Sequence, residues 1–120
     1  MNFHSNIGAD VGVLRLARYS ARIQAVGSEW DPRKAKENER KHDVSFLEAA
    51  TTLGDELGVK VPDPDHSIHE LRFLTVGLSS QNRLLIVSYA VRDRNVRIIS
   101  ARKLTRKERK AYETTRQKHN

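Results

Sequence analysis

Three consecutive β-strands are predicted by residues 70–102, which have the sequence ELRFLTVGLSSQNRLLIVSYAVRDRNVRIISAR. Apolar side chains dominate Glu70–Leu78, Arg83–Val91 and Val96–Arg102, and four polar residues separate each strand from the next. Connections this short join neighbouring strands in antiparallel order. The segment therefore predicts an antiparallel meander, with Arg83–Val91 apolar enough to be its central strand.

Two helices are predicted before this meander. The pair Asp31-Pro32 supplies an N-cap and a proline at the first helical position, so it predicts a helix over Arg33–His42. Asp43 follows as a C-terminal stop, because Asp tolerates left-handed geometry better than most residues. The capping-box pattern Ser45–Glu48 then opens a short helix that runs through Leu53.

An edge strand and a final helix complete the pattern. Apolar and other residues alternate over Leu57–Val61 before Pro62, which is typical of an edge strand. A second capping box, Thr105–Glu108, starts the last helix. Strands grouped between helices predict the α+β class: an antiparallel sheet of about four strands, with two N-terminal helices and one C-terminal helix and with helices packed against one face.

The chain is expected to hold one domain. Residues 28–113 form this domain, residues 1–27 are an N-terminal extension and residues 114–120 are a basic C-terminal tail. The extension shows no steady apolar period, so disorder and partial helix both stay open. Its Arg-rich, acid-poor stretch mimics an organelle transit peptide, but a frayed extension is the preferred interpretation.

Charge is strongly segregated along the chain. Residues 71–120 hold thirteen Lys/Arg and three Asp/Glu, a balance of +10, whereas residues 55–70 hold one Lys and five Asp/Glu, a balance of −4. A cationic half of this kind indicates a phosphate-rich or acidic partner. The sequence contains no Cys, which excludes disulfides and thiolate metal sites, and no apolar run approaches the ~18 residues of a membrane span. We therefore expect a cytoplasmic protein with no membrane partner.

Six pieces of the sequence carry a resemblance to a known family. In order, they are Glu29–Pro32 with Lys36 and Lys41-His42, Val44–Ala50, Pro62–Ser67, Glu70–Gly77, Arg97–Lys103, and Arg106–Arg109 with Tyr112.

This order of motifs resembles the BrnT family of toxin–antitoxin ribonucleases over roughly residues 29–113. The resemblance implies a small RelE-like α+β ribonuclease that inhibits translation by cutting RNA. It also implies a BrnA-type antitoxin that binds DNA and silences the toxin, so that DNA is contacted only through the antitoxin.

The sequence departs from the family at two places. Asp43 stands where the family usually has Gly, and Ala90-Val91 stands where it commonly has Thr-Glu between an aromatic or His residue and Arg. If the missing carboxylate takes part in catalysis, this chain is a weakened or inactive member. The competing hypotheses are therefore a basic protein that binds nucleic acid without cutting it, and a degenerate toxin that binds an antitoxin.

Four residues are candidates for catalysis by a metal-free ribonuclease. Glu70 and Arg72 are two apart on a strand, so they share a face, and Arg97 on the third strand is placed to approach it. We expect Arg72 and Arg97 to contact the scissile phosphate, because the guanidinium fork fits phosphate oxygens, and Glu70 to be the base. His42 is the candidate acid, since imidazole titrates near neutrality. The alternative is that these are surface ion pairs and helix-end charges.

Five further residues are candidates for RNA binding. Each has a cationic or aromatic side chain in or beside a predicted strand or helix. They are Lys41, Tyr89, Arg102, Arg106 and Arg109. The last helix is polar nearly all round, so a solvated face or an antitoxin-binding surface explains its lysines and arginines equally well. Trp30 and Tyr112 are each consistent with base stacking or with packing.

No metal ion and no cofactor is expected. The cluster of Asp63, Asp65, His66 and His69 has ligand-type side chains, but it lacks the spacing of a tetrahedral site and contains a stiffening proline. A solvated acidic loop is the preferred interpretation of this segment.

Overall fold

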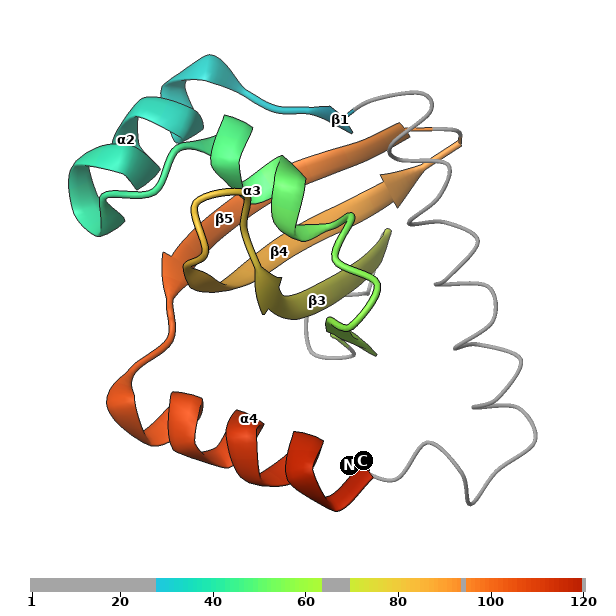
Figure 1. Ribbon diagram of the computed structural model, residues 1–120. Coiled ribbons are helices and arrows are strands. Elements are labelled where there is room, and N and C mark those ends of the chain that lie inside the picture. Colours follow the sequence, from blue (N-terminus) through green and yellow to red (C-terminus); the bar gives the residue numbers. More distant parts are fainter. Residues whose placement is uncertain (1–27, 64–69, 94, 120) are drawn as a thin grey trace.

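The computed structural model describes residues 28–63, 70–93 and 95–119, which form three helices and one sheet (Figure 1). The elements in chain order are β1 (Ser28–Glu29), α2 (Pro32–His42), α3 (Phe46–Thr52), β2 (Val59–Pro62), β3 (Leu71–Leu78), β4 (Leu84–Arg92), β5 (Asn95–Lys103) and α4 (Arg106–His119). The α+β prediction is confirmed. None of the described helices is long and apolar enough to cross a membrane.

The sheet has five strands in the order β1-β5-β4-β3-β2. The meander of β3, β4 and β5 is antiparallel as predicted, and β2 adds to β3 at one edge. The expected count of about four strands missed β1, which is only two residues long and pairs parallel with β5. Its register places Ser28 opposite Val96 and Glu29 opposite Arg97.

The helix ends show how the local sequence sets the elements. Asp31 accepts a hydrogen bond from the Arg33 amide at 2.8 Å, and Asp43 adopts the left-handed region with φ 57°. At the start of α3, Ser45 caps the Glu48 amide at 3.0 Å, but the Glu48 carboxylate does not complete the predicted box. It binds Arg83 and Ser79 instead, because those partners lie against the helix in the folded chain.

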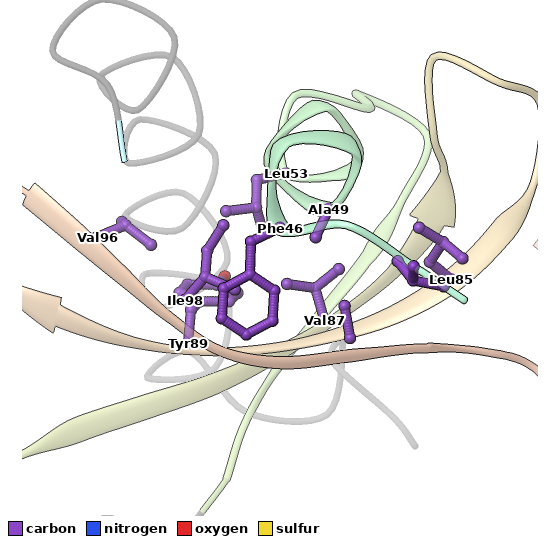
Figure 2. Packing of buried hydrophobic residues seen from close by; sticks show 10 residues of the cluster. Phe46, Ala49, Leu53, Leu85, Val87, Tyr89, Val96 and Ile98 are labelled. Carbon is purple, nitrogen blue, oxygen red and sulfur yellow. The ribbon is translucent and has the colours of Figure 1, made fainter. Parts of the chain in front are cut away.

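The hydrophobic core lies between one face of the sheet and the helices α2 and α3 (Figure 2). Phe46 and Ala49 of α3, and Leu53 at its C-terminal cap, project onto β4 and β5. The strand β4 contributes the alternate residues Leu85, Val87 and Tyr89. The strand β5 contributes Val96 and Ile98 and, beyond the bulge, Ala101. Trp30 packs edge-on against Phe46, with ring centroids 6.1 Å apart, so its role here is packing.

The last helix does not join this layer. Figure 1 shows α4 on the side of the sheet away from α2 and α3, so the expectation that helices pack against one face is wrong for α4. Arg102 faces this side, because it pairs across the sheet with Ile86 rather than with a core residue, and it binds Glu108 of α4 at 2.7 Å. The helix runs to His119. We call this second side of the sheet the open face.

A buried asparagine closes the edge of the sheet beside α2. The Asn38 amide accepts from the Ala101 N–H at 3.0 Å and donates to the Ala101 carbonyl at 2.8 Å. It also donates to the Val44 carbonyl at 2.9 Å. Asn38 is 6% exposed, so one side chain satisfies three backbone groups that would otherwise be buried without partners.

Acid should destabilise the fold through its paired glutamates. Hydrogen bonds from Arg102 lower the pKa of Glu108 from 4.5 to about 2, and those from Arg83 lower the pKa of Glu48. A depressed folded-state pKa stabilises the protein above pH 4.5, and this stability is lost as the pH falls towards 2. Glu108 is 36% exposed, so solvent screening limits its contribution to about 1 kcal/mol.

We therefore expect Glu108→Gln to lower the free energy of unfolding by about 1 kcal/mol at pH 7 and by much less at pH 2, where about half of the Glu108 carboxylates are protonated in the folded state. Urea denaturation at several pH values measures this difference. Glu113→Gln, an exposed position on the same helix, is the control. An equal loss for Glu108→Gln at both pH values would show that the ion pair with Arg102 is not the cause.

Candidate functional site

A row of side chains crosses three strands on the open face. Arg72 of β3 and Arg97 of β5 are both register partners of Ala90 in β4. Register partners in a sheet point to the same face, so both arginines flank Ala90 on the open face. Neighbouring strands lie about 4.8 Å apart, which puts the two Cα atoms roughly 10 Å apart, within the reach of two guanidinium groups.

The two members of this row on β4 and β5 differ in their surroundings. Ala90, between the two arginines, carries a single methyl group and is fully buried. The Arg97 side chain forms no hydrogen bond or ion pair with any residue that the structure describes, and it is only partly buried. A cation in this state is available to bind an anion.

Glu70 and Arg92 lie beside the row. Glu70 binds Arg72 through one carboxylate oxygen at 3.1 Å and Arg92 through the other at 3.1 Å. Hydrogen bonds from Arg92 and then from Arg72 outweigh the opposing effect of burial and lower the pKa of Glu70. A carboxylate held by two guanidinium groups is a weaker proton acceptor than a free one, so this geometry disfavours the predicted role of Glu70 as base.

Arg92 was not among the predicted site residues. The sequence places it in the polar run after the second strand, whereas the structure includes it as the last residue of β4. Its spacing of two from Ala90 puts it on the open face. That spacing is the signal by which the sequence could have indicated it.

Further cations line the open face towards α4. Arg102 lies five residues beyond Arg97 on β5, and a bulge near Ser88 and Tyr89 keeps both side chains on the same face. Arg102 is bound to Glu108, whereas Arg106 and Arg109 are exposed on α4. The predicted RNA-binding cations Arg102, Arg106 and Arg109 therefore lie on the same side of the sheet as the arginine row.

His42 and Lys41 lie away from this row. Both end α2 on the core side of the sheet, and Lys41 pairs with Glu37 at 3.5 Å. The next residue, Asp43, accepts through its carbonyl from Arg83 just before β4. Seven residues of strand separate Arg83 from Ala90, or about 23 Å. His42 is thus not brought together with Arg72 and Arg97, and the geometry does not support it as their acid.

Tyr89 points away from the open face. It is 2% exposed, stacks on Phe73 with ring centroids 5.9 Å apart and shares a 3.1 Å hydrogen bond with Thr75. Burial raises the pKa of its hydroxyl. The prediction that Tyr89 binds RNA does not fit this position, because the core would have to open for the contact. Tyr89 precedes Ala90 on β4, and successive side chains of a strand point to opposite faces, so Tyr89 points to the core face.

Most of the acidic loop lies outside the described residues. Of the four ligand-type side chains considered, only Asp63 is described, so the structure does not test the interpretation of Asp65, His66 and His69. Within residues 28–63, 70–93 and 95–119, no three His, Asp or Glu side chains gather as a metal site.

These observations define a small α+β protein with a cationic face on an antiparallel sheet. The family model described as ribonuclease toxin, BrnT, of type II toxin-antitoxin system matches residues 30–108. The chain therefore belongs to the BrnT family of ribonuclease toxins.

A solved structure shares the fold. The 1.1 Å crystal structure of the Brucella abortus ribonuclease toxin, BrnT, superposes with a TM-score of 0.53 at 18% sequence identity, and the match covers 66% of this chain and 96% of that chain. At this identity the likeness shows the fold alone. No curated protein matches the sequence.

The structure places the two residues of the Ala90-Val91 departure on different faces of the sheet. Ala90 lies on the open face between the arginines. Val91 lies on the core face, where it pairs with Leu71 and Val96 and packs against the hydrophobic cluster. A carboxylate at position 91 would point away from the arginine row, so its replacement by Val removes no group from that row.

Proposed function

We propose that this protein is a metal-independent endoribonuclease that cuts RNA at the arginine row. The observation that supports the proposal most directly is the placement of Arg72 and Arg97 on either side of Ala90. Guanidinium groups match phosphate oxygens in charge and geometry, and their preorganisation stabilises the charge that builds on phosphorus.

In this proposal a ribose 2′-oxygen attacks the adjacent phosphorus. The new bond joins O2′ to phosphorus and the bond from phosphorus to O5′ breaks, which leaves a 2′,3′-cyclic phosphate and a 5′-hydroxyl. A base takes the proton of the 2′-OH, and the departing O5′ takes a proton from water. Arg72 and Arg97 hold the non-bridging oxygens throughout, while Glu70 holds Arg72 and Arg92 in place.

The finer biological statements belong to the same proposal. Family membership and a net charge of +7 support a partner antitoxin with an acidic surface, which we propose to be of the BrnA type. RNA cleavage by the free toxin would inhibit translation, and both the RNA and the antitoxin would be met in the cytoplasm. The exposed cations of α4 are available to either partner.

We expect purified protein to cut RNA equally well with and without EDTA. A DNA oligonucleotide of the same sequence should not be cut, because the attacking 2′-OH is absent. Gel analysis of 5′-labelled oligonucleotides measures both results. Loss of cleavage in EDTA would contradict the metal-free mechanism.

Salt-sensitive binding of RNA without cleavage in either condition would contradict the nuclease proposal. That outcome would favour the second candidate, a binding protein that has lost its activity. Ala90 motivates this candidate, since the hydroxyl that the family commonly carries there is absent from the middle of the row.

A further inference from the structure

The arginine row does not end at Arg97. The parallel pairing of β1 with β5 makes Glu29 the register partner of Arg97. Register partners point to the same face, so the row reads Arg72, Ala90, Arg97 and Glu29 across four strands.

The next residue gives independent support for this orientation. Trp30 packs against Phe46 on the core face. Side chains alternate along an extended chain, so the Glu29 side chain points to the open face. A carboxylate is therefore placed beside Arg97 by a two-residue strand that the sequence pattern did not predict.

Two carboxylates thus border the phosphate position, and they differ in their surroundings. Both oxygens of Glu70 are occupied by guanidinium groups, from Arg72 and Arg92. Glu29 is exposed and makes no side-chain hydrogen bond or ion pair within the described part of the chain. A general base needs a free lone pair within hydrogen-bond reach of the proton that it removes.

We infer that Glu29 is the general base of the proposed reaction, and that Glu70 is a positioning residue. This inference rests on the proposed function, because it needs an RNA phosphate seated between Arg72 and Arg97. The Glu29 carboxylate takes the proton from the 2′-OH as O2′ bonds to phosphorus. Glu70 stays ionised and orients Arg72 and Arg92.

The closing experiment compares Glu29→Gln and Glu70→Gln with Glu37→Gln as the matched control. Glu37 is an exposed glutamate on α2, on the other side of the sheet. Two quantities are measured for each variant: the single-turnover rate on RNA, and the affinity for the same oligonucleotide with 2′-O-methyl groups, which cannot be cut. Circular dichroism melting verifies that each variant folds.

Glu29→Gln is expected to slow cleavage about a hundredfold and to change the affinity for methylated RNA by less than about twofold, since a base acts on the proton and not on the phosphate. Glu70→Gln is expected to slow cleavage less, by about tenfold, and to alter the affinity, because it releases two arginines. The Glu37→Gln control should match the wild type in both measurements.

A second substrate separates a base from an acid. An oligonucleotide with sulfur in place of the departing O5′ at the mapped cut site has a leaving group that needs no acid. Glu29→Gln should remain about a hundredfold slow on it, because removal of the 2′ proton is still required. Rescue to the wild-type rate would overturn the assignment of Glu29 as base.

The assignment of Glu29 as base can be wrong while the proposed nuclease function is right. If the wild type cleaves RNA and Glu29→Gln cleaves at the wild-type rate, then Glu29 is not the base although the arginine site stands. If the wild type does not cleave RNA at all, the proposed function itself fails.

Discussion

Replacing Arg97 with alanine is expected to slow RNA cleavage by about 10²–10³-fold, the usual effect of removing one preorganised donor from a developing charge. Arg97 is the register partner of Ala90 in β4 and makes no ion pair with a described residue. Its removal should therefore leave the free energy of unfolding within about 0.5 kcal/mol of the wild type. Single-turnover cleavage and urea denaturation measure the two quantities.

Arg40→Ala is the control for this substitution. Arg40 is also an arginine at the surface, but it pairs with Glu37 on α2, far from the row. The Arg40→Ala variant should cleave RNA at the wild-type rate. Equal cleavage rates for Arg97→Ala and Arg40→Ala would remove Arg97 from the site.

The largest loss of stability is expected from Asn38→Ala. This change removes the partners of the Ala101 N–H, the Ala101 carbonyl and the Val44 carbonyl, all in a buried setting. Each unsatisfied buried group costs about 1–3 kcal/mol, and partial relaxation brings the expected total to about 3 kcal/mol. Urea denaturation should show a lower midpoint with an unchanged slope.

Glu39→Ala provides the comparison for Asn38→Ala. Glu39 is the next residue of α2 and is exposed, so this variant should stay within about 0.5 kcal/mol of the wild type. A loss below 1 kcal/mol for Asn38→Ala would contradict the account of Asn38 as the group that closes the sheet edge.

The sequence predicted those elements whose signals are local. Alternation and short polar gaps predicted β3, β4 and β5, and capping residues predicted the starts of α2, α3 and α4. The strand β1 escaped prediction because two residues carry no period, and its pairing with β5 depends on the folded chain. With β1 missed, the position of Glu29 beside Arg97 was missed as well.

The candidate site was predictable only in part, for the same reason. Spacing of two along β3 put Glu70 and Arg72 on one face, and strand order brought Arg97 to it. Contacts across the sheet depend on the strand register, which cannot be read from the sequence. The pairing of Glu70 with both Arg72 and Arg92 was therefore not predicted. Asn38 is one of many polar residues in α2, and only tertiary packing buries it against β5, so the sequence analysis did not single it out.

The central claim is that Arg72 and Arg97 act on one phosphate, and a double-mutant cycle on cleavage tests it most directly. Single-turnover rates are measured for Arg72→Ala, Arg97→Ala and the double variant, with an unfolding curve for each. Residues that act as a unit on one group are coupled, so the double variant should lose much less than the product of the two single losses. A double variant whose loss equals that product would show that the two arginines act independently, and would contradict the shared phosphate.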